Sequence, residues 1–211
     1  MRTITLQPLR AFEVSVEAEA ISPRRFASLT LGQIRTQEVF MGNRKMKLAD
    51  LFKVEGDEPP ATPEETTVVP EGDFSKVKRI GECMSAGTLE VRGNVGMRAG
   101  SGMNGGLMAI RGNAGAYLGE HMCAGIIRVK GDAWDFPGAV NQGGTIFIGG
   151  DTYLPGAEMT NGFIMVRGKA TMLPSYRKAE VVTLEGVQYQ KYVGDLVENG
   201  TGELYAATSS P

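Results

Sequence analysis

The sequence predicts an all-β protein whose middle is a right-handed parallel β-helix of about 19 residues per coil, with a small α/β N-terminal cap and a short C-terminal cap. Three columns of glycine recur nineteen residues apart, with one last step of eighteen: Gly81, Gly100, Gly119, Gly138 and Gly156; Gly87, Gly106, Gly125, Gly144 and Gly162; Gly93, Gly112, Gly131, Gly150 and Gly168. Apolar pairs recur in the same register: Leu89/Val91, Met108/Ile110, Ile127/Val129, Ile146/Ile148 and Ile164/Val166. A spacing of two is the period of a strand with one buried face, and this long repeat is typical of a solenoid.

Each coil is expected to contain short strands joined by sharp corners. A helical repeat is excluded, because each glycine in the unit would cost about 0.5–1 kcal/mol relative to alanine. Asn or Asp follows the glycine of the third column at Asn94, Asn113, Asp132 and Asp151. These residue types tolerate a left-handed backbone, so we expect these positions to form corners.

The chain is predicted to divide into four regions. These are an N-terminal cap module (1–55), an acidic proline-rich linker (56–67), the coils (68–174), and a C-terminal cap with a polar tail (175–211). The end modules are expected to cover the apolar edges and unpaired strands that terminal coils expose.

Local signals predict several elements within the two end modules. Ser22 followed by Pro23 is typical of a helix start, so we expect a short helix over residues 24–31. Residues 39–48, with Gly42 and Asn43 in the middle, predict a hairpin. Residues 181–184 and 203–206 resemble strands.

Composition excludes several classes of function. The chain has 211 residues, 42% hydrophobic, and a net charge of −2, which argues against nucleic acid as a partner. No apolar run approaches the roughly 18 residues of a membrane span, and the N-terminus lacks the apolar core of a signal peptide. Two cysteines in 211 residues fit a reducing cytoplasm, where we expect the protein to reside.

The residues that most often carry chemistry are few and far apart. His121 and Cys83 occupy the same column two coils apart, and Cys123 is also two coils from Cys83. Two coils correspond to about 9–10 Å, too far for a disulfide and too wide for four zinc ligands. We therefore expect no catalytic, cofactor-binding or metal site in this chain.

Methionine recurs three residues after the first glycine column, at Met84, Met103, Met122 and Met159. Stacked thioethers that fill a corner of each coil explain this pattern better than a cofactor site. Asn141 interrupts the column, and it needs a hydrogen-bond partner if its side chain points inward.

Two surface columns are candidate interaction sites. Arg92, Arg111, Lys130 and Arg167 would stack along one face, with Gly149 as a gap. They form either a solvated face or a surface for an acidic partner or a ligand with several carboxylates. The aromatic residues Tyr117, Trp134, Phe136 and Tyr153 gather near one corner, as a docking face or as local core.

The regions outside the repeat resemble a known family. The coil pattern is similar to the GxxGxxxG β-helix found in the C subunit of formylmethanofuran dehydrogenase and in the C-terminal region of glutamate synthase. Gly42-Asn43-Arg44 and Leu48-Ala49-Asp50-Leu51-Phe52 resemble the N-terminal module of that C subunit, and Tyr192-Val193-Gly194-Asp195 and Gly202-Glu203-Leu204-Tyr205 resemble its C-terminal cap. This chain has fewer coils than we expect of the family.

The resemblance implies a non-catalytic scaffold in an archaeal complex. That complex reduces CO2 and attaches it to methanofuran as N-formylmethanofuran, reversibly, in the first step of methanogenesis. The resemblance also implies that a molybdenum or tungsten pterin guanine dinucleotide, iron–sulfur clusters and a binuclear metal site lie in other subunits (pterin-binding, ferredoxin-like and amidohydrolase-like). The basic column would then guide the glutamyl-rich tail of methanofuran. The alternatives are a glutamate-synthase-like protein and the C subunit of a formyltransferase/hydrolase complex.

Overall fold

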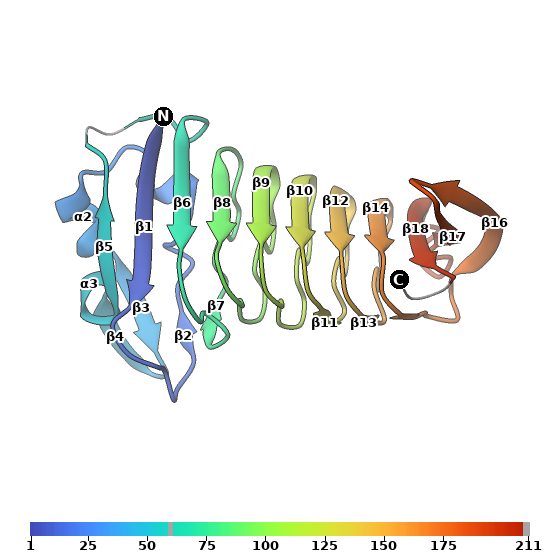
Figure 1. The fold of residues 1–211 in the computed structure, drawn as a ribbon, viewed down its shortest axis with the longest axis horizontal. Helices are drawn as coiled ribbons and strands as arrows, with labels where there is room; N and C mark the ends of the chain where they lie inside the picture. Colours follow the sequence, from blue (N-terminus) through green and yellow to red (C-terminus); the bar gives the residue numbers. More distant parts are fainter. Residues whose placement is uncertain (59–60, 209–211) are drawn as a thin grey trace.

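The computed structural model describes residues 1–58 and 61–208, and its architecture is mostly β-strand (Figure 1). Parts of the predicted linker and of the predicted polar tail, residues 59–60 and 209–211, lie outside the described residues. The prediction of an all-β protein is confirmed.

The described strands pair into three sheets. The main sheet has the order β16 (Arg177–Leu184), β17 (Val187–Gly194), β18 (Gly202–Ala207), β14 (Asn161–Val166), β12 (Gln142–Ile148), β10 (Ala124–Val129), β9 (Asn104–Ile110), β8 (Thr88–Val91), β6 (Thr66–Pro70), β1 (Arg2–Pro8) and β5 (Phe52–Gly56). The second sheet contains β11 (Ala133–Asp135), β13 (Thr152–Tyr153) and β15 (Ala170–Thr171). The third contains β4 (Arg44–Lys47), β3 (Glu38–Met41), β2 (Val16–Glu17) and β7 (Val77–Lys78).

The middle of the main sheet follows the predicted repeat. Strands β8, β9, β10, β12 and β14 are parallel, and Leu89, Met108, Ile127, Ile146 and Ile164 lie opposite one another in turn. These partners are separated by nineteen residues, and by eighteen in the last step, as in the glycine columns. Between successive strands the chain crosses to the far side and returns, so that it winds through a row of coils (Figure 1).

The interior of the coils is apolar. All five predicted apolar pairs are buried, and so are the four methionines of the column. The prediction of a methionine-filled core is therefore confirmed. Asn141 is fully buried in the same column; its Nδ2 donates to the carbonyl of Gly144 at 3.0 Å, and its Oδ1 accepts from the Gly144 N–H at 2.8 Å. The expected partner is present.

The corners are made differently from the prediction. Left-handed backbone recurs in one column of non-glycine residues at Arg79, Arg98, Tyr117, Phe136 and Leu154, and in a second column four residues later at Cys83, His121, Val140 and Glu158, with φ of 51–64°. Asn94, Asn113, Asp132 and Asp151 directly follow bends, as expected of corner positions, but without left-handed backbone. Their Oδ1 atoms instead accept from the backbone N–H of the equivalent residue one coil on, at 2.7–2.9 Å. Each side chain thus satisfies a backbone donor and forms a ladder along the stack.

The N-terminal module contains three short helices: α1 (Pro23–Phe26), α2 (Leu31–Arg35) and α3 (Leu48–Leu51). Ser22 caps α1 as predicted, by accepting from the N–H of Arg25 at 3.3 Å. The predicted helix over 24–31 was too long, because Thr30 and Gln33 form a capping box that starts a second helix. The predicted hairpin is confirmed as β3 and β4, and Leu48 belongs to α3.

Antiparallel strands end the main sheet on both sides. At one end β1 pairs with β6 in parallel and with β5 antiparallel. At the other end β18 pairs with β14 in parallel and with β17 antiparallel, and β17 pairs with β16 (Figure 1). The predicted strands at 181–184 and 203–206 are confirmed within β16 and β18, whereas β17 and β1 were missed.

Candidate interaction surfaces

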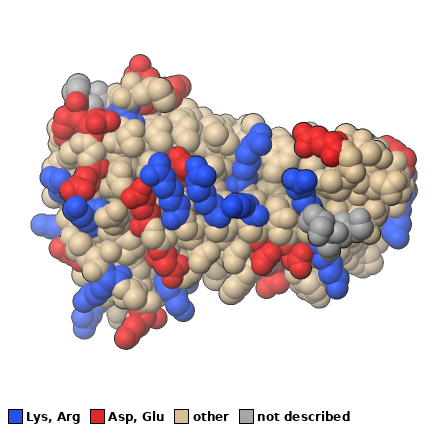
Figure 2. Space-filling model, in the orientation of Figure 1, with Lys and Arg blue, Asp and Glu red and all other residues tan. Residues whose placement is uncertain are grey.

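The basic column lies on the outer side of the main sheet. The N–H groups of Arg111, Lys130 and Arg167 each donate to a strand carbonyl one coil earlier, at 2.9–3.0 Å, which places them at equivalent positions. All three side chains are exposed, as is Arg92. Basic side chains gather across the middle of this face in Figure 2.

Two of these cations already have carboxylate partners. Arg92 contacts Glu71 at 2.6 Å, and Arg111 contacts Glu90 at 2.6 Å. The hydrogen bonds that Arg111 donates lower the pKa of Glu90, with a smaller contribution from Arg92. Within the residues that the structure describes, Lys130 and Arg167 form no ion pair. The repulsion expected along the column is thus relieved at its first two positions and remains at the others.

The gap in the basic column has a steric cause. Gly149 occupies the position equivalent to Arg92, Arg111 and Lys130. A Cβ atom at Gly149 would overlap the backbone carbonyl of Lys130. No side chain fits at this position without a shift of the backbone.

Aromatic residues extend the same face toward β18. Phe147 and Phe163 lie 5.8 Å apart, and Phe163 and Tyr205 lie 5.1 Å apart between ring centroids. The guanidinium of Arg128 lies 4.8 Å above the ring of Phe147. Sequence reasoning missed these residues, although each alternates with an inward residue of a predicted strand.

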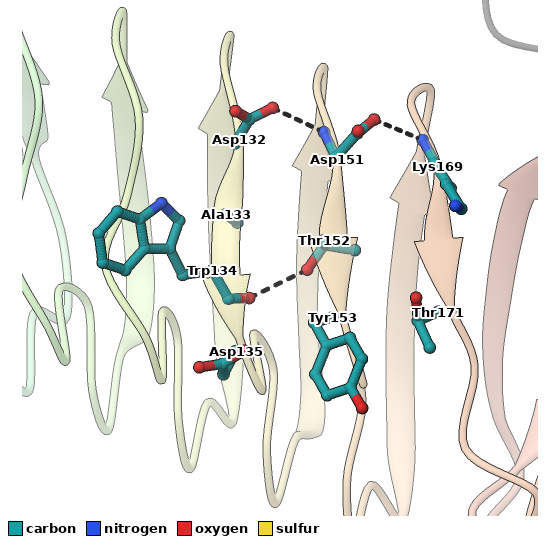
Figure 3. Close-up of a pocket in the computed structure, with 9 residues that line it drawn as sticks. All are labelled: Asp132, Ala133, Trp134, Asp135, Asp151, Thr152, Tyr153, Lys169 and Thr171. Carbon is teal, nitrogen blue, oxygen red and sulfur yellow. Dashed lines mark hydrogen bonds between the residues drawn. The ribbon is translucent and has the colours of Figure 1, made fainter.

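A second candidate surface lies over the second sheet, around a shallow pocket (Figure 3). Its walls come from β11, β13, β15 and their flanking turns: Asp132, Ala133, Trp134, Asp135, Asp151, Thr152, Tyr153, Lys169 and Thr171. The side chains of Trp134 and Tyr153 are 64% and 50% exposed. Both therefore lie on the surface rather than in a local core.

The four predicted aromatics form two groups instead of one. Tyr117 and Phe136 occupy the left-handed corner, with their rings stacked at 5.3 Å. Arg98 lies 5.4 Å from the centroid of Tyr117 and pairs with Glu120 at 2.9 Å. Because Tyr117 and Phe136 are half-buried by each other, the larger exposed aromatic surface belongs to Trp134 and Tyr153.

The cysteines and the histidine lie on the surface of the protein. Cys83 and Cys123 are free and exposed, and His121 is exposed. Among residues 1–58 and 61–208, no group of three or more His, Cys, Asp and Glu could hold a metal ion. In the same part of the chain, none of the helices has the length and apolarity needed to traverse a lipid bilayer.

Curated relatives of this chain are named as C subunits of formylmethanofuran dehydrogenase, the family that the regions outside the repeat resemble. The chain is 41% identical over 97 residues to the C subunit of the tungsten-containing formylmethanofuran dehydrogenase 2 of Methanothermobacter wolfeii, over 46% of this chain and 36% of that protein. It is 35% identical over 97 residues to the C subunit of the molybdenum-containing formylmethanofuran dehydrogenase 1 of Methanosarcina barkeri, over 46% and 32%. The resemblance is confirmed. The match spans about a third of the length of these relatives. No protein-family model matches the chain.

One solved structure shares the fold along nearly the whole chain. It is a chain from the crystal structure of the formyltransferase/hydrolase complex from Methylorubrum extorquens in complex with methylofuran. The match has a TM-score of 0.63 and 22% identity, and covers 97% of this chain and 100% of that one. The end modules and the coils therefore belong to one shared fold.

Proposed function

We propose that this chain is a non-catalytic structural subunit of a formylmethanofuran dehydrogenase complex in the cytoplasm of an archaeon. That complex is an oxidoreductase that reduces CO2 and attaches it reversibly to methanofuran as N-formylmethanofuran. The observation that carries the proposal is the 41% identity to a relative named as the C subunit of such an enzyme. The identity is accompanied by a fold match over 97% of the chain.

The proposed architecture is a right-handed parallel β-helix with a cap at each end, divided as the sequence predicts into 1–55, 56–67, 68–174 and 175–211. Support comes from the constant register between parallel strands and from the second sheet, whose bridges continue back through Ala114 and Val95. Hydrogen bonds between every coil and the next make such a stack stiff along its axis. A stiff element is suited to holding the active sites of other subunits at a fixed separation.

The redox and transfer chemistry would take place in partner subunits. These would be pterin-binding, ferredoxin-like and amidohydrolase-like chains that hold a molybdenum or tungsten pterin guanine dinucleotide, iron–sulfur clusters and a binuclear metal site. The composition supports this assignment, since each cluster needs several cysteine ligands and the chain has two cysteines and one histidine.

The basic column would guide the carboxylate-rich tail of methanofuran between those sites. Lys130 and Arg167 support this role best, because they are exposed and carry no carboxylate partner among the described residues. Arg92 and Arg111 would contribute less, because their positive charges are already offset by the carboxylates of Glu71 and Glu90. Exposed cations in a row attract a flexible polyanion without fixing it at one point, which suits a moving tail.

Affinity purification of the tagged chain from its own cells, without oxygen, tests the proposal. We expect the other subunits to co-purify with molybdenum or tungsten, and we expect the preparation to form N-formylmethanofuran from CO2. A chain that turns over substrate alone, or that co-purifies with a glutamate synthase, would refute it.

The alternative is the C subunit of a formyltransferase/hydrolase complex. The fold match favours it in one respect, because it covers 100% of the solved chain, whereas the curated dehydrogenase relatives are covered over about a third of their length. The same purification separates the two functions. Formyl transfer by a complex that contains neither molybdenum nor tungsten would establish the alternative.

A further inference from the structure

The surface over the second sheet combines exposed aromatic rings with carboxylates. We define the acidic-aromatic face as Asp132, Trp134, Asp135, Asp151 and Tyr153. It lies on β11, β13 and the turns before them (Figure 3), separate from the basic column on the main sheet. Contact between the apolar surface of an indole and water is unfavourable, and exposed tryptophan is enriched where partner proteins dock.

The face is held rigid by hydrogen bonds between coils. Thr152 Oγ1 donates to the carbonyl of Trp134 at 3.2 Å, and the N–H of Trp134 donates to the carbonyl of Ala114 at 3.1 Å. The Oδ1 of Asp132 accepts from the N–H of Asp151 at 2.8 Å. A binding surface that is already ordered loses little conformational entropy when it is occupied.

The face carries an excess of negative charge. Three carboxylates surround the rings, and Lys169 is the single cation in the pocket lining. Within the described residues, Asp132, Asp135 and Asp151 form no ion pair. Asp135 follows Trp134 on β11 and lies opposite Tyr153 in the strand register. A cation at this point would contact an aromatic ring and a carboxylate together.

We propose that the acidic-aromatic face binds a basic segment of a partner protein, with an arginine side chain stacked on Trp134 and paired with Asp135. Arginine suits the site better than lysine, because its planar guanidinium stacks on an indole and donates two parallel hydrogen bonds to a carboxylate. The indole points along the stack toward the preceding coil (Figure 3), in which the equivalent position in the repeat is Gly115. The segment would then run along the coils, and a second cation would meet Asp151.

Fluorescence titration of the full chain tests the proposal, because Trp134 is the one tryptophan in the sequence. The probe is a synthetic octapeptide of alternating glycine and arginine, compared with the lysine and glutamate versions. We expect a saturable change in tryptophan emission with the arginine peptide, weaker binding of the lysine peptide and none of the glutamate peptide. Raising the salt concentration should weaken the arginine complex, since exposed charges are screened.

Charge-removing variants locate the binding site. Asp135→Asn combined with Asp151→Asn should lower the affinity for the arginine peptide at least about tenfold, because two exposed carboxylates are lost. The Asp151→Asn change keeps the Oδ1 ladder, in which Asn94 and Asn113 already take part. Glu198→Gln, on an exposed turn of the C-terminal cap, removes the same kind of charge elsewhere and should leave the affinity unchanged.

A calorimetric titration with Trp134→Ala provides a readout that does not depend on the fluorophore. We expect this variant to lose binding of the arginine peptide while its melting temperature stays close to that of the wild type. Equal affinities for the wild type and the Asp135/Asp151 double variant would overturn the proposal. Absence of a saturable signal with the wild type would do the same.

Discussion

The two outer faces of the coil stack carry opposite charge, although the same repeat builds both. The main sheet presents Arg92, Arg111, Lys130 and Arg167 in a row, whereas the second sheet presents the acidic-aromatic face. The basic row recurs in four of five coils, but Trp134 and Tyr153 stand where earlier coils have Gly96 and Gly115. One face therefore follows the repeat and the other departs from it.

The difference separates two kinds of constraint. Inward positions repeat because each coil must fill the same cross-section, as the buried methionine column does. Outward side chains do not have to fill a cross-section. An outward column that departs from the repeat therefore reflects what that surface contacts. By this criterion the acidic-aromatic face is specific to two adjacent coils, and the basic column is a property shared by four of the five coils.

The largest effect is expected from a substitution that disturbs the strand supporting the basic face. Gly149→Ala should destabilise the protein by about 1–3 kcal/mol, because the added methyl group overlaps the Lys130 carbonyl and the backbone must shift. Urea unfolding monitored by circular dichroism measures the free energy of unfolding. Gly149→Arg would complete the basic column in sequence, and we expect it to destabilise at least as much.

Gly32→Ala is the matched control for that substitution. Gly32 lies in α2, and the nearest atom to an added Cβ is Thr30 Oγ1 at 3.9 Å. Alanine is favoured over glycine within a helix by about 0.5–1 kcal/mol, so this variant should be stabilised. If both substitutions destabilise equally, the gap in the basic column does not have a steric cause.

Charge reversal distinguishes the two halves of the basic column. Lys130→Glu combined with Arg167→Glu should lower the affinity of the full chain for a hexaglutamate peptide about tenfold or more, because the cations without carboxylate partners are lost. Arg92→Glu combined with Arg111→Glu should lower it less. Isothermal titration calorimetry at low salt measures both. Equal losses of affinity in the two double variants would show that Glu71 and Glu90 do not weaken the attraction of Arg92 and Arg111 for the peptide.

Removing one acceptor from the ladder of side-chain oxygens should have a smaller effect on stability. Asp132→Ala should cost about 1 kcal/mol, because the N–H of Asp151 loses its acceptor. Asp132→Asn should be close to neutral in stability, since Asn94 and Asn113 accept the equivalent bonds. Thermal unfolding of the two variants measures the difference. Equal destabilisation would mean that the charge of Asp132, rather than its Oδ1 atom, stabilises the turn.

Sequence reasoning was most accurate where the repeat constrains the interior. Strand register, the buried methionines and the bonded Asn141 follow from periodicity, because only inward residues must match between coils. The left-handed backbone was assigned to the wrong column, since Asn and Asp favour both a left-handed backbone and side-chain acceptance from a backbone N–H. Spacing in the sequence does not distinguish these two uses.

The candidate surfaces were predictable in part. The column positions of the basic residues and their exposure agree with the structure, but their partners did not follow from the sequence. Glu71 lies before the first regular coil, and Glu90 pairs across to the next strand. The division of the aromatics into two groups follows the repeat, since Tyr117 and Phe136 are nineteen residues apart and so are Trp134 and Tyr153. Sequence reasoning placed both pairs at one corner and did not separate the two columns.

The smallest expected effect concerns the pH dependence of the basic face. Arg111 and Arg92 hold the pKa of Glu90 below its ordinary value of 4.5. A lowered pKa in the folded state means that these contacts add stability above that ordinary value and lose it as the pH falls through the folded-state pKa. Exposed ion pairs contribute roughly 0–1 kcal/mol, so Glu90→Gln should be slightly less stable than the wild type at neutral pH. The free energies of unfolding of the two proteins should become equal in acid, and urea unfolding across the pH range measures the difference between them. A difference in stability that persists unchanged at low pH would show that Glu90 stabilises the fold through packing instead of charge.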